Sequence, residues 1–202
     1  RADDHVQNIA NLLESKTFAR HYPKAASRRV GKYGNSQGWR RQRLRTADGF
    51  TVDAIGLDTA ARGVKVDNTT EEGDAQGVRP DFLIFDDIDD PLDSPAEVTK
   101  KIKMVTTSIL PARAPHAASL VVQNLIHADS IVARLADGRA DFLANRVVSG
   151  PHPALRNAAY EQGADMKWRI VAGEPTWAAM GIPELQADLD EIGITAFRSE
   201  KQ

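Results

Sequence analysis

Two adjacent carboxylates, Asp86 and Asp87, directly follow a short run of apolar residues at 82–85. A short and fully apolar run is typical of a strand buried on both faces, as in a parallel sheet covered by helices. Open α/β sheets bind ligands at the carboxyl ends of their strands, where these carboxylates would lie. One Asp can hold Mg²⁺, often through water, while the next acid orients the water that attacks a nucleotide. The pattern predicts part of a nucleotide-hydrolysis site, and an acidic turn after a core strand is the alternative.

Two more carboxylates, Asp89 and Asp90, follow at once. A two-metal phosphodiesterase site would require all four acids to converge. Adjacent residues of a strand point to opposite faces, so we do not expect that convergence. We expect Asp89 and Asp90 to be solvated residues of the turn.

The next predicted strand, at 119–126, also ends in polar side chains, among them Gln123 and Asn124. If this strand neighbours residues 82–85, its amides would lie beside Asp86, where an amide could sense the γ-phosphate of a nucleotide. The alternative is a plain turn, which Asn at a strand end commonly forms.

One arginine and one absent motif bear on the same site. Arg62 lies in a stretch at 58–78 that is poor in apolar residues, and we expect a mobile loop there. A loop arginine can reach a phosphate as an arginine finger does, or it can simply be solvated. The sequence contains no phosphate-binding loop of the form GxxxxGK[ST], since Gly31-Lys32 lacks both the upstream Gly and the following Ser or Thr. These residues alone cannot form a complete P-loop NTPase.

Charge is unevenly distributed, although the net charge is only -2. Residues 81–93 contain six Asp and no Lys or Arg, whereas the segment 16–45 contains no acidic residue. Its ten basic residues are Lys16, Arg20, Lys24, Arg28, Arg29, Lys32, Arg40, Arg41, Arg43 and Arg45. An arginine-rich segment with few aromatic residues fits a phosphate backbone better than base edges, and a solvated basic face is the usual alternative. The predicted nucleic-acid contacts lie on a strand expected at 39–46: Arg40, Arg41, Arg43 and Arg45.

Composition bounds the class of protein. The chain has 202 residues, 42% of them hydrophobic and 27% charged, as in an ordinary globular protein. With no Cys, disulfides and thiolate metal sites are excluded, and the five His show no metal-ligand spacing. No apolar run is long enough to span a membrane.

The predicted elements alternate between strands and helices. Apolar periodicity predicts an amphipathic helix at 2–15, a loop follows at 18–38, and a hairpin joins the strands 39–46 and 50–57. A capping box at Ser94 and Glu97 begins a helix that Pro111 should end. The remaining predictions are a short helix at 129–136, weak strands at 142–148 and 167–171, a helix through Leu185 and Leu189, and a polar tail at 197–202. This order favours an α/β fold with a mostly parallel sheet flanked by helices.

Three stretches, in this order, resemble the large terminase subunit of tailed bacteriophages: GLDTAARG at 56–63, RPDFLIFDDIDD at 79–90 and LVVQNLIHADSI at 120–131. The closing FRSEKQ at 197–202 is similar to the segment that leaves the ATPase domain of that family. The resemblance covers most of the chain. It implies a RecA-like (ASCE) P-loop ATPase domain that packages DNA, followed in the family by a metal-dependent nuclease domain.

The resemblance also implies roles for single residues. Asp86 would be the Walker B acid that holds Mg²⁺, and Asp87, where Glu is commoner, the catalytic acid. Gln123 and Asn124 would belong to the coupling motif that contacts ATP, and Arg62 would be the loop arginine. The family's phosphate-binding loop would lie before Ala2, so the fold would be incomplete at its N-terminus.

The implied organisation is an ATPase part at 1–175 and a helical linker at 176–202. The implied partners are double-stranded DNA, the portal protein, the small terminase subunit and further copies in a ring, with no membrane, in the cytoplasm of an infected bacterium. Two alternatives stay open. One is a non-catalytic nucleic-acid-binding module that uses the segment 16–45, with Asp86 and Asp87 as structural residues. The other is an acid-cluster nuclease.

Overall fold

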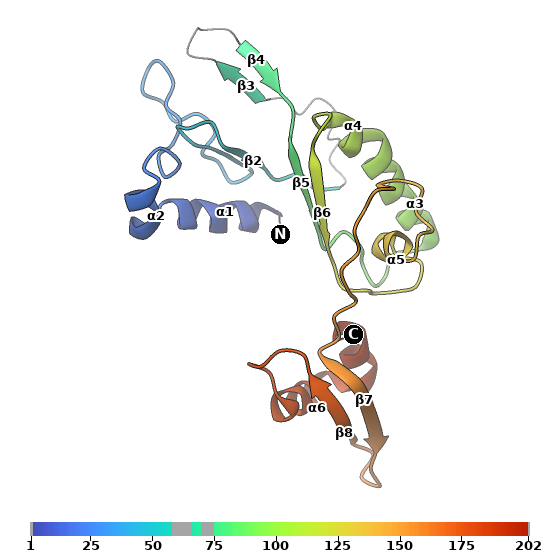
Figure 1. The fold of residues 1–202 in the computed structure, drawn as a ribbon. Coiled ribbons are helices and arrows are strands. Elements are labelled where there is room, and N and C mark those ends of the chain that lie inside the picture. The colour runs from blue at the N-terminus through green and yellow to red at the C-terminus, as the bar shows by residue number, and fades with distance from the viewer. Residues whose placement is uncertain (1, 58–65, 70–74, 202) are drawn as a thin grey trace. The chain divides into compact units, whose positions relative to one another are not determined.

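The computed structural model describes residues 2–57, 66–69 and 75–201 (Figure 1). The chain divides into two compact units. The first comprises Arg1–Leu83 and Lys103–Ala118, and the second comprises Ile84–Ile102 and Ser119–Gln202. Among the described residues, no helix is long and apolar enough to cross a membrane.

The first unit begins with the predicted amphipathic helix, α1 (Ala2–Leu13). Val6, Ala10 and Leu13 are buried at helical spacing, while Leu12 is exposed. The prediction of a helix is therefore confirmed, with Leu12 outside the buried stripe.

A hairpin packs on α1. Strand β1 (Arg43–Arg45) pairs antiparallel with β2 (Thr51–Asp53), and Leu44 joins the apolar cluster of α1. The turn between the strands contains Gly49 at φ 96°, a left-handed conformation that glycine adopts without steric cost. The predicted hairpin is confirmed, but β1 is shorter than the predicted strand 39–46 and leaves Arg40 and Arg41 outside it.

Two stretches predicted as loops contain regular structure. A short helix, α2 (Lys16–His21), begins at Ser15, whose hydroxyl accepts a hydrogen bond from the Phe18 N–H at 3.3 Å. Within the predicted loop 58–78, β3 (Val66–Thr69) and β4 (Ala75–Val78) form an antiparallel hairpin. The sequence does not predict either element because neither has a marked hydrophobic periodicity. A side-chain cap begins α2, and strand pairing forms the β3–β4 hairpin.

Strands β5 (Phe82–Asp86) and β6 (Ala118–Val122) form a parallel pair. The Ala118 N–H donates to the Asp81 carbonyl at the start of the pair, and the Asp87 N–H donates to the Val122 carbonyl at its end. The prediction of a chain that combines helices and strands is thus confirmed, and the two strands are the neighbours that the sequence analysis considered, but a mostly parallel sheet is not found among the described strands. The described strands form four two-stranded sheets, and the other three pairs are antiparallel.

The prediction that these two strands are buried on both faces is wrong for the described residues. Phe82 is 52% exposed and Ile84 is 62% exposed, and Leu120 and Val122 on β6 are exposed as well, whereas Phe85 is buried. Figure 1 shows α3 and α5 on one side of the pair. Alternate residues face opposite sides of a strand, so helices on a single side leave the other apolar face uncovered.

Helix α3 (Pro95–Met104) begins with the predicted capping box. The Ser94 N–H donates to Glu97 Oε2 at 2.8 Å, and the Glu97 N–H donates to Ser94 Oγ at 3.3 Å. These hydrogen bonds to Ser94 lower the pKa of Glu97. The helical path continues through a π-helical turn, Val105–Ile109, into α4 (Leu110–Ala112), and so ends one residue after Pro111, close to the predicted end. Pro111 lies at the start of α4, where proline needs no N–H partner.

A short helix, α5 (Ile131–Ala136), follows β6, as predicted. It is capped by the Ser130 hydroxyl, which accepts from the Ala133 N–H at 3.1 Å, and Gly138 follows its end at φ 86°. Residues 142–148, predicted as a weak strand, contain none.

The C-terminal part of the second unit is an antiparallel hairpin, β7 (Leu155–Gln162) and β8 (Trp168–Pro175), with the helix α6 (Ile182–Glu200). Leu185, Leu189 and Phe197 of α6 are buried in one cluster with Leu155 of β7. The expected polar tail from residue 197 is therefore wrong, because Phe197 is a core residue. The predicted boundary at residue 175 falls between β8 and α6, which share this core.

Candidate functional site

The carboxyl ends of β5 and β6 bring together the polar residues that the sequence singled out. Asp86 is the last residue of β5, and Asp87 follows with an exposed side chain and a left-handed φ of 47°. Residues other than glycine rarely adopt this conformation, although Asp and Asn tolerate it best. The chain therefore turns sharply at Asp87, at the point where its N–H still pairs with Val122.

Gln123 connects the two strand ends through its side-chain amide. The Asp89 N–H donates to Gln123 Oε1 at 3.0 Å, and Gln123 Nε2 donates to the Asp89 carbonyl at 3.3 Å. Both ends of the amide are thus occupied by the backbone of the acidic turn. In this arrangement Gln123 holds the turn in place, whereas the side chain of Asn124 is exposed at the same edge.

Asp89 is a structural residue, contrary to the sequence-based expectation. The sequence predicts a solvated acid, but Asp89 is only 6% exposed. Its Oδ1 accepts a hydrogen bond from the Ile131 N–H at 2.8 Å and its Oδ2 accepts from the Val132 N–H at 3.0 Å. Both N–H groups belong to the first turn of α5, where the helix itself offers them no acceptor, and the helix dipole also favours a carboxylate there. The expectation that the four acids do not converge agrees with this placement.

The rest of the acidic turn is also tied to its own surroundings. Asp93 Oδ2 accepts from the Asp90 N–H at 2.8 Å and from Lys101 Nζ at 2.5 Å, and Lys101 Nζ also donates to the Ile88 carbonyl at 3.0 Å. Burial raises the pKa of Asp93, but the hydrogen bonds from Lys101 and Asp90 and the nearby positive charge outweigh it, so that the pKa lies below its usual value.

The exposed residues at this edge that could meet a ligand are Asp86, Asp87 and Asn124. Mg²⁺ prefers oxygen ligands and keeps several waters, so one or two protein carboxylates are enough to hold it beside a nucleotide. Within the described ranges no three His, Cys, Asp or Glu side chains gather as a metal-ligand set, which such a site does not need. The edge therefore fits the metal side of a Mg²⁺–nucleotide site. Arg62 lies outside the described residues.

The arginines predicted to bind DNA have different surroundings. Arg43 makes a two-pronged ion pair with Asp53, in which Nη2 lies 3.0 Å from Oδ2. The hydrogen bond with Asp53 raises the pKa of Arg43 against the opposing effect of burial. Arg41 Nε lies 3.0 Å from Asp3 of α1. Arg45 is half-buried, with its side chain against Gly38.

Arg40 is exposed, but it lines a pocket of about 380 Å³ in which opposite charges face each other. The basic residues around this pocket are Arg28, Arg40 and Arg41, and the acidic ones are Asp3, Asp4 and Glu14. Equal numbers of positive and negative groups leave little net attraction for a phosphate.

Comparisons of the chain with protein-family models, with curated proteins and with solved structures find no match. The geometry of the β5–β6 edge therefore carries the functional interpretation.

Proposed function

We propose that this chain is part of an ATP-driven DNA translocase similar to the ATPase part of large terminase subunits. One observation carries the proposal: two parallel neighbouring strands end together, one in Asp86-Asp87 and the other in Gln123-Asn124. Ligand sites of open α/β sheets lie at such an edge. A nucleotide-hydrolysing site of the RecA-like class needs acids and a polar sensor in this arrangement.

The roles follow from the placement of the residues. Asp86 would hold Mg²⁺, which supplies charge neutralisation for the phosphates of ATP. Asp87 would orient the attacking water. Its backbone is left-handed, so its side chain does not follow the alternation of side chains along β5. Strained backbone of this kind is concentrated at functional sites. Asn124 is the amide available to a γ-phosphate, and Gln123 would keep the acidic turn in register with β6.

The uncovered face of the β5–β6 pair supports a larger sheet. Parallel strands are normally covered on both faces, and a pair of strands leaves hydrogen-bonding edges unused. A RecA-like domain would supply further strands and a second layer of helices. It would also supply the phosphate-binding loop, which these 202 residues lack.

The partners and the location are part of the same proposal. The translocase would act on double-stranded DNA as a ring of identical subunits, with the portal protein and the small terminase subunit, in the cytoplasm of an infected bacterium. Arg62 would be the finger that reaches a phosphate, its own or that of an adjacent subunit.

A mutational experiment tests the site. We expect the full-length protein to hydrolyse ATP with stimulation by DNA, and Asp86→Ala to abolish turnover, because the Mg²⁺ ligand is lost. Asp81→Ala, an exposed Asp just before the same strand, is the matched control and should leave turnover unchanged. Hydrolysis by Asp86→Ala at the wild-type rate would refute the assignment.

Two simpler observations test the same proposal. The coding sequence upstream of Ala2 should encode a GxxxxGK[ST] loop. The 202-residue chain by itself should neither bind nor hydrolyse ATP, and clear turnover by the purified chain would contradict the need for that loop.

A second candidate is a non-catalytic nucleic-acid-binding module that uses the segment 16–45. Exposed cations of this segment that have no acidic partner among the described residues, such as Arg20 and Lys32, favour it. Salt-sensitive DNA binding by the full-length protein without any effect of Mg²⁺ or ATP would favour this candidate over the translocase.

A further inference from the structure

Two sets of three basic residues in the segment 16–45 have different surroundings. Arg28, Arg41 and Arg43 are paired with Glu14, Asp3 and Asp53, respectively. Arg28 also lies over the ring of Trp39, 5.1 Å from its centroid. These side chains hold the first unit together. Among the residues that the structure describes, no ion pair or side-chain hydrogen bond engages Arg20, Lys24 or Lys32, all of which are exposed.

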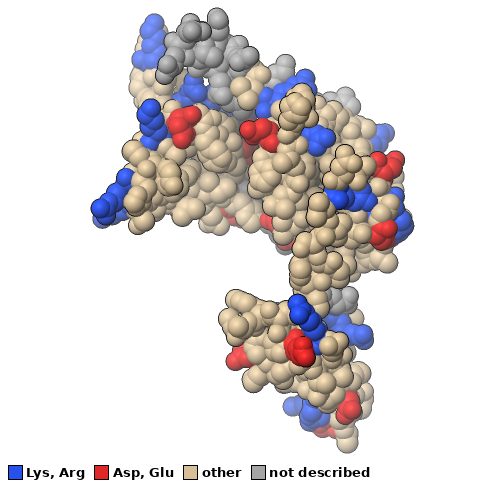
Figure 2. Space-filling model, viewed as in Figure 1, with Lys and Arg blue, Asp and Glu red and all other residues tan. Residues whose placement is uncertain are grey.

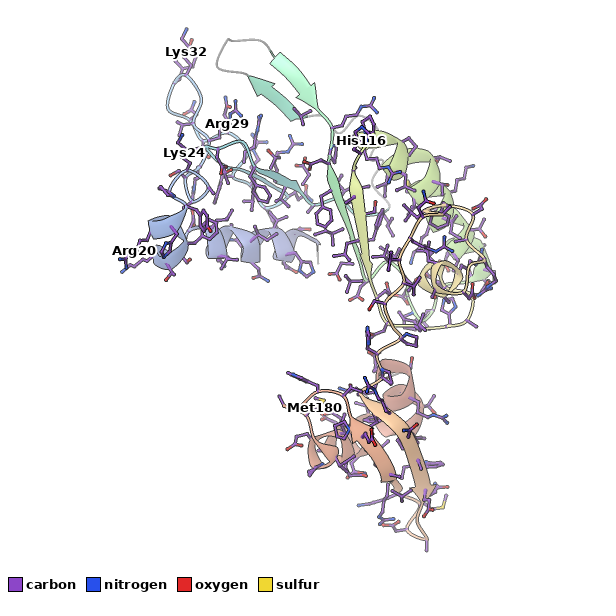
Figure 3. The ribbon with its side chains drawn as sticks, in the orientation of Figure 1. Arg20, Lys24, Arg29, Lys32, His116 and Met180 are labelled. Carbon is purple, nitrogen blue, oxygen red and sulfur yellow. The ribbon has the colours of Figure 1, made fainter. Side chains whose placement is uncertain are left out.

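The second set lies along one edge of the first unit, from α2 through the loops that follow it. Figure 3 shows Arg20, Lys24 and Lys32 along this edge, with Arg20 and Lys32 directed outward. Figure 2 shows positively charged side chains projecting from the same edge. We call Arg20, Lys24 and Lys32 the outer basic surface.

Lys32 is carried by a tight, projecting loop. An antiparallel bridge joins Val30 to Ser36, and the Gly31 N–H donates to the Asn35 carbonyl at 2.9 Å. The tip contains Lys32, a Tyr33 that is 85% exposed, and Gly34 at φ 78°. A left-handed glycine closes such a tip at low steric cost, which leaves Lys32 and Tyr33 projecting into solvent.

Backbone hydrogen bonds anchor this loop to the hairpin below it. The Arg29 N–H donates to the Arg45 carbonyl of β1 at 3.0 Å, and the Gln37 N–H donates to the Arg29 carbonyl at 2.7 Å. The neighbouring turn is anchored in the same way, since the Ala47 N–H donates to the Ser27 carbonyl at 2.8 Å. Cations presented by an anchored backbone lose less conformational entropy on binding than cations on a free chain.

We propose that the outer basic surface binds the phosphate backbone of duplex DNA. Unpaired and exposed cations on a short helix and on the anchored loops after it suit a line of phosphates, whereas the predicted contacts Arg41 and Arg43 are occupied by acidic partners. This proposal rests on the proposed function in one respect, the choice of duplex DNA as the partner. The residues that carry it all belong to the first unit, so it does not depend on the nucleotide site.

The size of the effect follows from counterion release. Each neutralised phosphate of duplex DNA contributes about 0.9 to the slope of log affinity against log salt concentration. The three cations therefore account for a slope of about 2.7. Between about 50 and about 200 mM salt, these contacts alone should weaken binding roughly 40-fold.

The test is a titration of a labelled short DNA duplex with the 202-residue chain, followed by fluorescence anisotropy at several salt concentrations. The triple variant Arg20→Gln/Lys24→Gln/Lys32→Gln is compared with a control that removes the same charge elsewhere, Lys103→Gln/Arg156→Gln/Lys167→Gln. The control residues are exposed and form no ion pair with another described residue. Circular dichroism establishes that both variants remain folded.

We expect the first variant to lose roughly tenfold or more in affinity and to have a salt slope smaller by about 2.7, while the control keeps a slope close to that of the wild type. Equal losses in the two variants would show a general charge effect and would overturn the proposal. Binding of polyglutamate in preference to DNA would also overturn it, since the surface would then serve an acidic protein. Asp86→Ala should leave DNA binding unchanged, so failure of the nucleotide site and failure of this surface can be told apart.

Discussion

The acidic segment at 81–93, which comprises β5 and the acidic turn after it, and the basic segment at 16–45 are both runs of a single charge, but the protein uses their charges in different ways. In the acidic turn, Asp89 and Asp93 bind mainly backbone N–H groups and one lysine, so the carboxylates build the turn itself. In the basic segment, Arg41 and Arg43 reach acidic residues of α1 and β2, whereas the cations of the outer basic surface project into solvent.

The difference arises from the hydrogen bonds that each type of charged side chain can form. A carboxylate accepts hydrogen bonds, so it can satisfy the unpaired N–H groups at a helix start without any partner of opposite charge. Arginine and lysine only donate, and when they pair within the protein they need carboxylates or carbonyls that are supplied by other elements. In both regions, the structure thus assigns part of the charged side chains to holding the fold itself.

The largest effect should come from Asp89. Asp89→Ala removes the acceptor of two N–H groups of α5, and each unsatisfied buried donor costs about 1–3 kcal/mol. We expect a loss of roughly 3 kcal/mol in the free energy of unfolding of the second unit, measured by chemical denaturation, with faster amide exchange in α5. The exposed Asp81→Ala is the control. Equal stability of the two variants would show that Asp89 is no different from a solvated acid.

A smaller effect is expected at Arg43. Its ion pair with Asp53 is half-exposed, so screening limits its contribution, and Arg43→Ala should destabilise the first unit by about 1 kcal/mol. Arg40→Ala, at an exposed arginine without an ion pair in the described structure, should change the stability by less than about 0.5 kcal/mol. A double-mutant cycle with Asp53→Ala isolates the pair. A coupling energy near zero would show that the ion pair of Arg43 with Asp53 does not stabilise the first unit, and would contradict its structural role.

A third effect, similar in size to that at Arg43, depends on pH. The pKa of Asp93 is lower in the folded protein than its usual value of about 3.9, so its ion pair with Lys101 stabilises the protein above that pH and less so as the pH falls through the folded value. Asp93→Asn should cost about 1 kcal/mol near neutral pH. The difference from the wild type should shrink below about pH 4, as measured by denaturation at several pH values. A difference that stays constant down to about pH 2 would contradict the ionic origin of the contact.

Much of the local structure could be predicted because it is encoded by neighbouring residues. The capping box at Ser94 and Glu97, the stripe of α1 and the apolar run of β5 depend on short spacings and caps. The elements that the sequence does not predict, α2 and the β3–β4 hairpin, lack a strong apolar period. Phe197 is not predicted as a core residue for another reason, because it is a single apolar residue in a polar stretch. The packing of α6 on β7 and β8 buries it.

For the site, the sequence by itself determined which residue types stand at the ends of two strands, and that these strands belong to an α/β fold. Only the tertiary structure decided that Asp89 caps α5, that Gln123 clamps the acidic turn, and that Arg41 and Arg43 are paired while the cations of the outer basic surface are exposed. The reason is physical: Asp89 and α5 are about forty residues apart in the chain. Whether a charge is solvated, buried or paired depends on such distant partners, and local spacing carries no information about them.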